Sequence, residues 1–166
     1  MARAALQQLK LDQLVWIPTG APGYRNAPLA TPEHRLAMLR IALDGDHKSV
    51  IDERELAPGA SGYTVDTLKD LRRERKDAEL FLLLGADQYA NFQRWREPEE
   101  VARLARLAVF ARPGFEVKHG NALAVSMAPM PVSASDIRAR AARGEKLDGL
   151  VPAAVENYIS RHRLYR

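Results

Sequence analysis

Residues 79–85, read ELFLLLG, form the segment that most narrows what this chain can fold into. An uninterrupted apolar run of this kind is typical of a strand that is buried on both faces of a parallel sheet. The run ends at Gly85, where a backbone without a side chain lets a ligand come close. It therefore predicts a buried strand over residues 79–84 and a ligand-binding position directly after it.

Strand-like and helix-like patterns alternate along the rest of the chain. Short apolar runs predict further strands over residues 14–17, 49–52, 107–111 and 122–127. Apolar residues at three- and four-residue steps predict helices over residues 2–9, 31–43, 64–71, 98–105, 133–143 and 152–162. This alternation indicates an α/β fold, in which a parallel sheet is flanked by helices and two helices form a small C-terminal part.

Length and charge limit the kinds of partner. A chain of 166 residues fits one compact domain, residues 1–166. The net charge of +4 favours phosphorylated or polyanionic partners only mildly. The basic residues are interleaved with acidic ones, which argues against a nucleic-acid-binding surface.

Missing residue types exclude several classes of site. The chain has no cysteine, which excludes disulfides, thiolate zinc sites, iron–sulfur clusters and cysteine nucleophiles. Its 4 histidines are scattered without helical pairing, so we predict no metal site on the protein. The longest apolar stretch, residues 80–86, is far shorter than the ~20 residues that cross a bilayer. The N-terminus lacks the apolar core of a secretory signal, and we expect a cytoplasmic protein without a membrane partner.

Ligands of open parallel sheets bind beyond the carboxyl ends of the strands, so the residues that follow each strand are the candidates. Four segments qualify: residues 18–25, 62–67, 85–95 and 131–138. In the last of them, Ser133 and Ser135 begin a helix whose N-terminus suits an anion, with Arg138 one turn inside. The alternative is that one serine only caps the helix and that Arg138 is a solvated side chain.

The other segments are open to two interpretations as well. Asp87 could accept hydrogen bonds from ribose hydroxyls, or it could cap the helix that follows it. Trp95 offers a flat face for a heterocycle, although a tryptophan beside Phe92 could equally belong to the core. Arg25, on a loop rich in glycine and proline, could hold a phosphate or could simply be exposed. Taken singly, no segment decides the function.

Read together, the motifs resemble those of bacterial nicotinate mononucleotide adenylyltransferases, in that family's order and over nearly the whole chain. They are WIPTGAPGYR, TPEHRLAMLRIAL, GYTVDTL, LLLGADQY, FQRW, VFARPG, PVSASDIR and LVPAAVENYISRHRLYR. VSASDIR and the tail are shared in part with other nucleotidylyltransferases, whereas YTxDT together with the tryptophan points to the nicotinate enzyme. The resemblance implies a Rossmann-like nucleotidylyltransferase fold.

The same resemblance implies an activity. Such enzymes transfer AMP from ATP to nicotinate mononucleotide, a late step of NAD biosynthesis, by direct in-line attack of the mononucleotide phosphate on the α-phosphorus. Mg²⁺ shares the stabilisation of charge with the protein. Tyr63 and Thr64 would present backbone groups to the nicotinate, and Trp95 would stack on its pyridine ring.

The remaining roles implied by the resemblance concern ribose and phosphates. Gly85 and Asp87 would bind ribose, and Arg25 would contact a phosphate. The triphosphate would be held at the helix N-terminus by Ser133, Ser135 and Arg138, with Arg112 as a further candidate. Asp66 and Thr67 complete the YTxDT motif, and we expect them to be structural, as a first-turn acid and a cap.

The chain departs from the family pattern in three places. The early loop has Tyr24-Arg25 where the family has His before the basic residue, and Gly62 replaces the usual serine before Tyr-Thr. No GxFxPxHxGH sequence occurs, so the two histidines that act on the ATP phosphates are not among these residues and no catalytic residue is identified. We expect a truncated sequence rather than a genuine short form, because losing the sheet's central strand would leave its neighbours unpaired. If the chain folds as given, we expect little or no adenylyl transfer.

Two other functions stay open. One is a related adenylyltransferase for another phosphorylated acceptor, such as nicotinamide mononucleotide or phosphopantetheine. The other is a catalytically inactive nucleotide-binding fragment. The basic and aromatic tail, residues 158–166, serves either packing or contact with a second subunit in a homo-oligomer.

Overall fold

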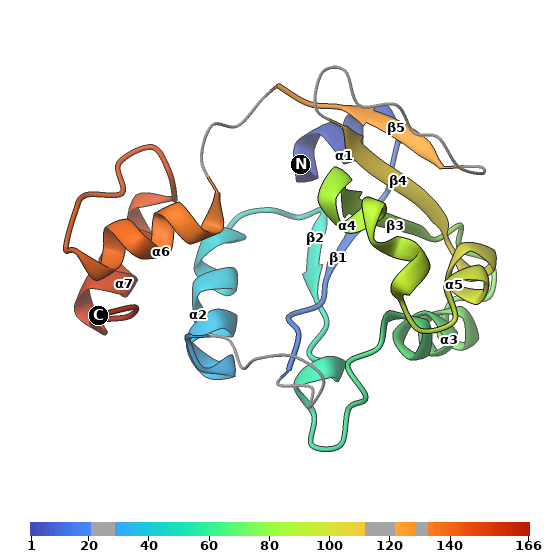
Figure 1. The fold of residues 1–166 in the computed structure, drawn as a ribbon, viewed down its shortest axis with the longest axis horizontal. Helices are drawn as coiled ribbons and strands as arrows, with labels where there is room; N and C mark the ends of the chain where they lie inside the picture. The colour runs from blue at the N-terminus through green and yellow to red at the C-terminus, as the bar shows by residue number, and fades with distance from the viewer. Residues whose placement is uncertain (21–28, 112–121, 129–132) are drawn as a thin grey trace. The chain divides into compact units, whose positions relative to one another are not determined.

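The computed structural model describes residues 1–20, 29–111, 122–128 and 133–166 (Figure 1). Helices and strands alternate as predicted, and each predicted element is present with small shifts of its ends. In chain order the elements are α1 (Ala2–Gln8), β1 (Leu14–Trp16), α2 (Pro32–Ala42), β2 (Ser49–Ile51), α3 (Thr64–Glu74), β3 (Phe81–Gly85), α4 (Ala86–Ala90), α5 (Pro98–Leu104), β4 (Arg106–Ala111), β5 (Leu123–Ser126), α6 (Ala134–Ala142) and α7 (Ala153–Arg161).

Two local expectations are wrong. The short helix α4 begins directly where β3 ends, with Gly85 as its N-cap, so Asp87 lies in the first turn and does not cap the helix. The sequence pattern missed this because no turn residues separate the strand from the helix. Helix α3 has Tyr63 as its N-cap, and Thr67 is buried inside the helix rather than capping it.

Contacts along the backbone divide the chain into two compact units, each made of two stretches. One unit comprises Met1–Leu14 and Ser61–Pro129, and the other comprises Val15–Ala60 and Met130–Arg166. Strands pair within two sheets, β1–β2 and β3–β4–β5. Within the described ranges, no helix is long and apolar enough to cross a membrane. A single domain over residues 1–166 stays a prediction.

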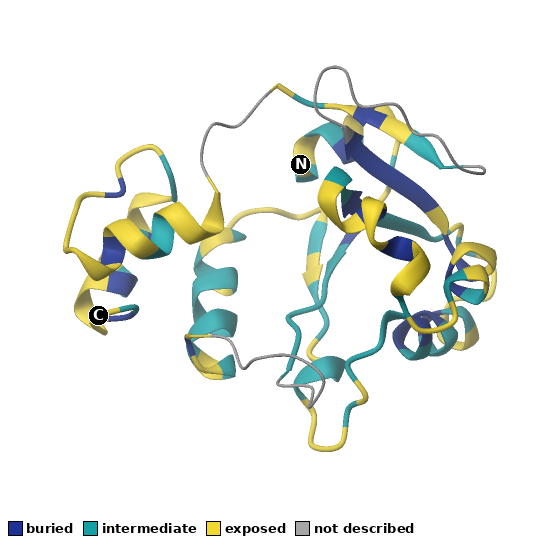
Figure 2. Ribbon diagram, viewed as in Figure 1, coloured by how far each residue is buried: buried dark blue, intermediate teal, exposed yellow. Residues whose placement is uncertain are grey.

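The first unit is built on the parallel sheet β3–β4–β5, which confirms the predicted parallel strand. Its predicted burial on both faces is wrong, because only Leu84 of β3 is buried, the rest of the strand is half-buried and Glu79 is exposed. Phe81 pairs with Arg106 and Gly85 with Phe110 across β3 and β4. The centre of β4 is dark blue in Figure 2, and its residue Val109 has no exposed surface (0%). The sheet therefore holds the end of β3, where ligand contacts are expected, on a rigid base.

Side-chain hydrogen bonds join the helices of the first unit to the sheet and to the segments beside it. Gln8 of α1 and Ser126 exchange two hydrogen bonds, of 2.7 Å and 3.0 Å. Arg72 of α3 donates from Nε to the carbonyl of Leu104 at 2.9 Å and from Nη1 to that of Ala78 at 2.7 Å. These two hydrogen bonds to partly buried carbonyls fix the C-terminal end of α3 to the unit.

The second unit contains β1, β2 and the helices α2, α6 and α7. The indole N–H of Trp16 donates to Ser49 Oγ at 2.9 Å and ties the two strands together. The helices of the second unit enclose a core formed by Ala141, Leu147, Val155, Ile159 and Leu164. Two of these core residues, Ile159 and Leu164, belong to the basic and aromatic tail, which favours the packing interpretation of that tail.

Candidate functional site

The turn that starts α3 contains Tyr63 and Thr64. Gly62 has a φ of +68°, in the left-handed region that favours glycine, and this conformation leads the chain into the helix. The N–H of Tyr63 donates to Ser61 Oγ at 3.2 Å, and the Ser61 hydroxyl donates to Asp66 Oδ2 at 2.7 Å. Asp66 is therefore the structural first-turn acid that the sequence predicts. The N–H groups of Tyr63 and Asp66 already donate, to Ser61 Oγ and to the Tyr63 carbonyl. The backbone donors that this helix start offers to an anionic group are therefore those of Thr64 and Val65.

The junction of β3 and α4 holds the predicted ribose contacts. A methyl group on Gly85 would lie 2.6 Å from Asp87 Oδ1, so the Asp87 carboxylate folds back over the glycine backbone. Asp87 is exposed, and Asn91 Nδ2 donates to its carbonyl oxygen at 3.0 Å, which fixes the backbone at this position. The arrangement leaves an accessible carboxylate at the end of β3, able to accept hydrogen bonds from hydroxyl groups.

Trp95 ends a row of aromatic side chains that begins in the core. Tyr89 and Phe92 are stacked with ring centres 6.4 Å apart, and the indole of Trp95 lies 5.6 Å from Phe92 at a tilt of 56°. Phe92 is buried, whereas Trp95 is only half-buried. Trp95 therefore has a supported ring with surface left for another flat group, which agrees with both interpretations from the sequence.

The N-terminus of α6 is a complete capping box. Ser133 Oγ accepts from the N–H of Asp136 at 3.1 Å, and Asp136 Oδ2 accepts from the N–H of Ser133 at 3.0 Å. The Ser133 hydroxyl also faces Ser135 Oγ at 2.9 Å. Two hydrogen bonds lower the pKa of the Asp136 carboxyl below its usual value. The one from the Ser133 side chain has the larger effect, and the one from the Ser133 backbone has the smaller. The capping interpretation of Ser133 is confirmed.

Arg138 lies one turn into α6 and is half-buried. In the part of the chain that the structure describes, its guanidinium has no hydrogen-bond or ion-pair partner. It is close enough to Tyr165 to act on its phenol: burial raises the pKa of Tyr165, and the charges of Arg138 and Arg35 partly offset that rise. Arg138 is thus not a fully solvated side chain, and its charge is available to an anion.

The structure brings some predicted residues together and leaves others outside its description. Tyr63, Thr64, Gly85, Asp87 and Trp95 all lie in the first unit, whereas Ser133, Ser135 and Arg138 lie in the second. Arg25 and Arg112 lie outside the described residues, so their predicted phosphate contacts stay predictions.

Sequence reasoning missed one residue beside the predicted site. The guanidinium carbon of Arg96 lies 4.6 Å from the centre of the Tyr63 ring. The only signal in the sequence was its position directly after Trp95, and a single arginine in a polar segment is ordinary.

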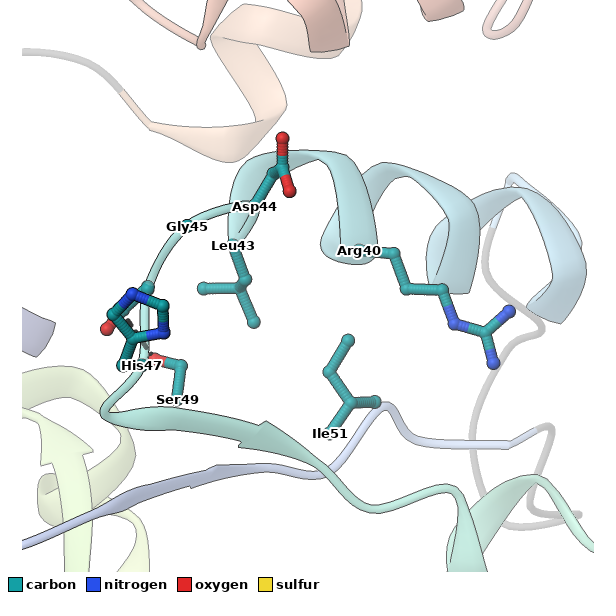
Figure 3. Close-up of a pocket in the computed structure, with 8 residues that line it drawn as sticks. Arg40, Leu43, Asp44, Gly45, His47, Ser49 and Ile51 are labelled. Carbon is teal, nitrogen blue, oxygen red and sulfur yellow. Dashed lines mark hydrogen bonds between the residues drawn. The ribbon is translucent and has the colours of Figure 1, made fainter.

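A hollow of about 370 Å³ occurs in the second unit, between the end of α2 and β2 (Figure 3). Charged residues of both signs line it, including Arg40, Asp46 and His47. Asp46 already accepts from the Ser49 hydroxyl at 2.8 Å, and Arg40 pairs with Glu53 at 2.5 Å. None of the predicted site residues lines this hollow, and we assign no substrate to it.

Side chains that could bind a metal ion lie apart from one another in the described residues. No group of three or more histidine, aspartate or glutamate side chains in the described ranges is arranged to hold a metal ion. The described residues therefore do not fit a metal site made by the protein alone.

Comparison with known families and proteins gives a consistent result. The family model described as cytidylyltransferase-like matches residues 1–140. A protein of Bordetella petrii named "probable nicotinate-nucleotide adenylyltransferase" is 42% identical over 179 residues, which cover 100% of this chain and 90% of that protein. A protein of the same name from Chromobacterium violaceum is 38% identical, and the alignment again covers 100% of this chain and 90% of the relative.

Solved structures share the fold at low sequence identity. The nicotinic acid mononucleotide adenylyltransferase of Plasmodium falciparum, complexed with NaAD, matches with a TM-score of 0.81 at 15% identity. That match covers 99% of this chain and 88% of the other. A second structure of the same enzyme, complexed with APC, matches with a TM-score of 0.78 at 15% identity, over 98% of this chain and 87% of the other. At this level of identity the likeness establishes the Rossmann-like fold alone.

Proposed function

Since the chain belongs to the nicotinate-nucleotide adenylyltransferases of the cytidylyltransferase-like family, we propose that its residues serve AMP transfer from ATP to nicotinate mononucleotide. An oxygen of the mononucleotide phosphate attacks the α-phosphorus of ATP. The bond from the α-phosphorus to the bridging oxygen breaks, and pyrophosphate leaves as nicotinate adenine dinucleotide forms. The protein's task in such a reaction is to position two anions and to stabilise developing charge.

The observation that carries this proposal is the placement of three acceptor features in one compact unit. The turn at Tyr63 and Thr64 presents the backbone N–H of Thr64, which suits the nicotinate carboxylate, and Tyr63 leads the chain into that turn. Trp95, supported by Phe92, has free ring surface suited to the pyridine. The accessible carboxylate of Asp87, beside Gly85, suits the ribose hydroxyls.

The residues of the second unit suit the phosphates of ATP. The N–H and hydroxyl of Ser133 are engaged with Asp136, so we assign the anion contacts to the backbone N–H groups of the first turn, to the Ser135 hydroxyl and to Arg138. Ser133 contributes by holding that turn in place. Arg25 and Arg112 are proposed as further phosphate contacts on their sequence positions alone.

Mg²⁺ is proposed as a companion of ATP. Magnesium is usually held by substrate phosphates and water, with only one or two protein carboxylates. It would neutralise charge on the phosphates, while the chain's own residues orient the triphosphate. The cytoplasmic location and a homo-oligomeric state stay predictions from the sequence.

Calorimetry on the full 166-residue chain tests the proposal, with nicotinate mononucleotide and ATP–Mg²⁺ titrated separately beside a pyrophosphate-release assay. Binding of nicotinate mononucleotide in preference to nicotinamide mononucleotide and phosphopantetheine supports the acceptor assignment. Preference for one of the other acceptors would favour the related-transferase alternative. Because no HxGH sequence occurs in the chain, binding without turnover would support the substrate contacts while leaving catalysis unassigned. A folded chain that binds neither ligand would contradict the proposal.

A further inference from the structure

Arg96 contacts the turn that starts α3 at two places. Its guanidinium carbon lies 4.6 Å from the centre of the Tyr63 ring, which is the geometry of a cation–π contact. Its Nη1 lies 4.0 Å from Asp66 Oδ2, and Asp66 in turn accepts from the Ser61 hydroxyl. The same turn is the one to which the proposed function assigns the nicotinate carboxylate.

Glu97, the next residue, contacts the same face of α3 one turn further on. Lys69 Nζ donates to Glu97 Oε2 at 2.8 Å, and this hydrogen bond raises the pKa of Lys69 above its usual value. Residues three apart lie on one helix face, as Asp66 and Lys69 do. The pair Arg96-Glu97 therefore lies along the first two turns of α3.

Trp95, the residue before this pair, is held by the core instead. Its backbone N–H donates to the carbonyl of Phe92 at 2.9 Å, and its ring lies against that of Phe92. Arg96 is thus the residue that joins the ring proposed to stack on the pyridine to the turn proposed to bind its carboxylate.

The magnitudes argue against a role in overall stability. The Arg96 side chain is 50% exposed, and its distances to Asp66 and Glu97 are 4.0 Å and 3.6 Å. Exposed ion pairs of this kind contribute little to folding and often nothing measurable. A fixed separation between two recognition elements, in contrast, improves affinity by removing the cost of ordering them on binding.

We propose that Arg96 is a positioning residue for the acceptor, because it holds the Tyr63 turn and Trp95 at the separation that nicotinate mononucleotide requires. This inference rests on the proposed function. It concerns acceptor binding alone and leaves the binding of ATP untouched.

The test compares Arg96→Ala, Arg96→Lys and a matched control, Arg94→Ala, in the full chain. Arg94 is exposed and lies two residues before Arg96, within the 3-10 turn Phe92–Arg94. We expect Arg96→Ala to raise the Kd for nicotinate mononucleotide about fivefold, from the usual worth of an exposed cation–π contact, and Arg96→Lys to restore part of the loss. Arg94→Ala should leave that Kd unchanged, and the Kd for ATP–Mg²⁺ and the unfolding midpoint should change in none of the three.

A second measurement, made without ligand, tests whether Arg96 holds Trp95 in place without relying on the affinity for the acceptor. In a Trp16→Phe background, where Trp95 is the only tryptophan, Arg96→Ala should make Trp95 fluorescence more accessible to acrylamide, whereas Arg94→Ala should not. Tyr63→Leu should act on the same contact, so its effect on acceptor binding and that of Arg96→Ala should not add. If the parent chain binds the acceptor and both readouts are unchanged in Arg96→Ala, the inference is overturned while the proposed function stands. If the folded parent chain does not bind the acceptor, the proposed function fails and this inference fails with it.

Discussion

The indole of Trp95 lies 5.6 Å from the ring of Phe92, at an angle of 56°, so one buried aromatic residue supports one half-buried one. Replacing Trp95 should therefore weaken acceptor binding, whereas replacing Phe92 should weaken folding. Trp95→Ala removes a stacking surface worth about 1–3 kcal/mol, so we expect acceptor affinity to fall roughly 5- to 150-fold with little change in unfolding. Phe92→Ala removes a core side chain and should cost about 3–5 kcal/mol of stability. Calorimetry and urea unfolding measure the two quantities, and equal loss of stability in both variants would contradict this division.

Substitutions of the two serines at the start of α6 should also have different effects, one on stability and the other on ATP binding. Ser133 closes the capping box with Asp136, so Ser133→Ala should lower the free energy of unfolding by about 1 kcal/mol. Ser135 has no such capping role, and Ser135→Ala should leave stability almost unchanged while it weakens ATP binding. Titration with ATP–Mg²⁺ and thermal unfolding of both variants check the assignment. Loss of stability in Ser135→Ala without loss of ATP affinity would show that both serines are structural.

Local signals explain how much of the fold could be predicted. The cap of α2 is an example: Thr31 Oγ1 accepts from the N–H of His34, and Pro32 opens the helix as its sequence position predicts. Such features depend on residues a few positions apart, and so does the strand β3, although its burial depends on the elements that pack on it. The contact of Arg96 with Tyr63 depends on two segments that only the folded unit brings together, so no local pattern predicts it.

The site shows the same limit. Sequence reasoning identified Ser133 but could not choose between a cap and a phosphate contact, because a serine before a helix suits either role. The choice depends on the orientation of the Asp136 carboxylate, which accepts both the N–H and the hydroxyl of Ser133. A cap was one of the two roles open for Asp87, and it is excluded because α4 begins directly after β3 with Gly85 as its N-cap, which nothing in the sequence indicates.

Gly85→Ala should disturb ribose recognition rather than folding. The new methyl group would lie 2.6 Å from Asp87 Oδ1, at the far end of an exposed side chain that can rotate away. We expect a stability loss of about 1 kcal/mol, from the poorer cap and the local crowding, and a several-fold loss of acceptor affinity because the carboxylate is displaced. Asp87→Asn, which keeps the side-chain size, is the matched comparison. Unchanged acceptor binding in both variants would remove Asp87 from the site.

The capping box predicts a specific pH dependence. Hydrogen bonds from Ser133 hold the pKa of Asp136 below its ordinary value of 3.8, so the ionised carboxylate stabilises the folded chain. Because the folded pKa is lowered, that stabilisation is complete above about pH 5 and is lost as the pH falls through 3.8 and below. The unfolding midpoints of the parent chain and Asp136→Asn should differ at pH 7 and converge in acid. In a Ser133→Ala background the difference at pH 7 should be smaller. A difference between the parent chain and Asp136→Asn that does not change with pH would contradict the explanation.

Arg138 and Arg140 provide the sharpest test of the ATP contacts, because they lie two residues apart on the same helix. Arg138 is half-buried and has no ion-pair or hydrogen-bond partner within the described residues, whereas Arg140 is exposed. A charge-assisted hydrogen bond to a phosphate contributes about 1.5–3 kcal/mol, so Arg138→Ala should weaken ATP–Mg²⁺ binding roughly 10- to 150-fold. Arg138→Lys should retain part of the affinity, because it keeps the charge but loses the planar fork.

Arg140→Ala is the matched control: it removes the same charge from an exposed position and should change the Kd for ATP–Mg²⁺ less than about twofold, since exposed charges are screened. Nicotinate mononucleotide binding should be the same in all these variants. Equal losses of ATP affinity in Arg138→Ala and Arg140→Ala would mean that only the net charge of α6 attracts ATP and that Arg138 makes no specific contact.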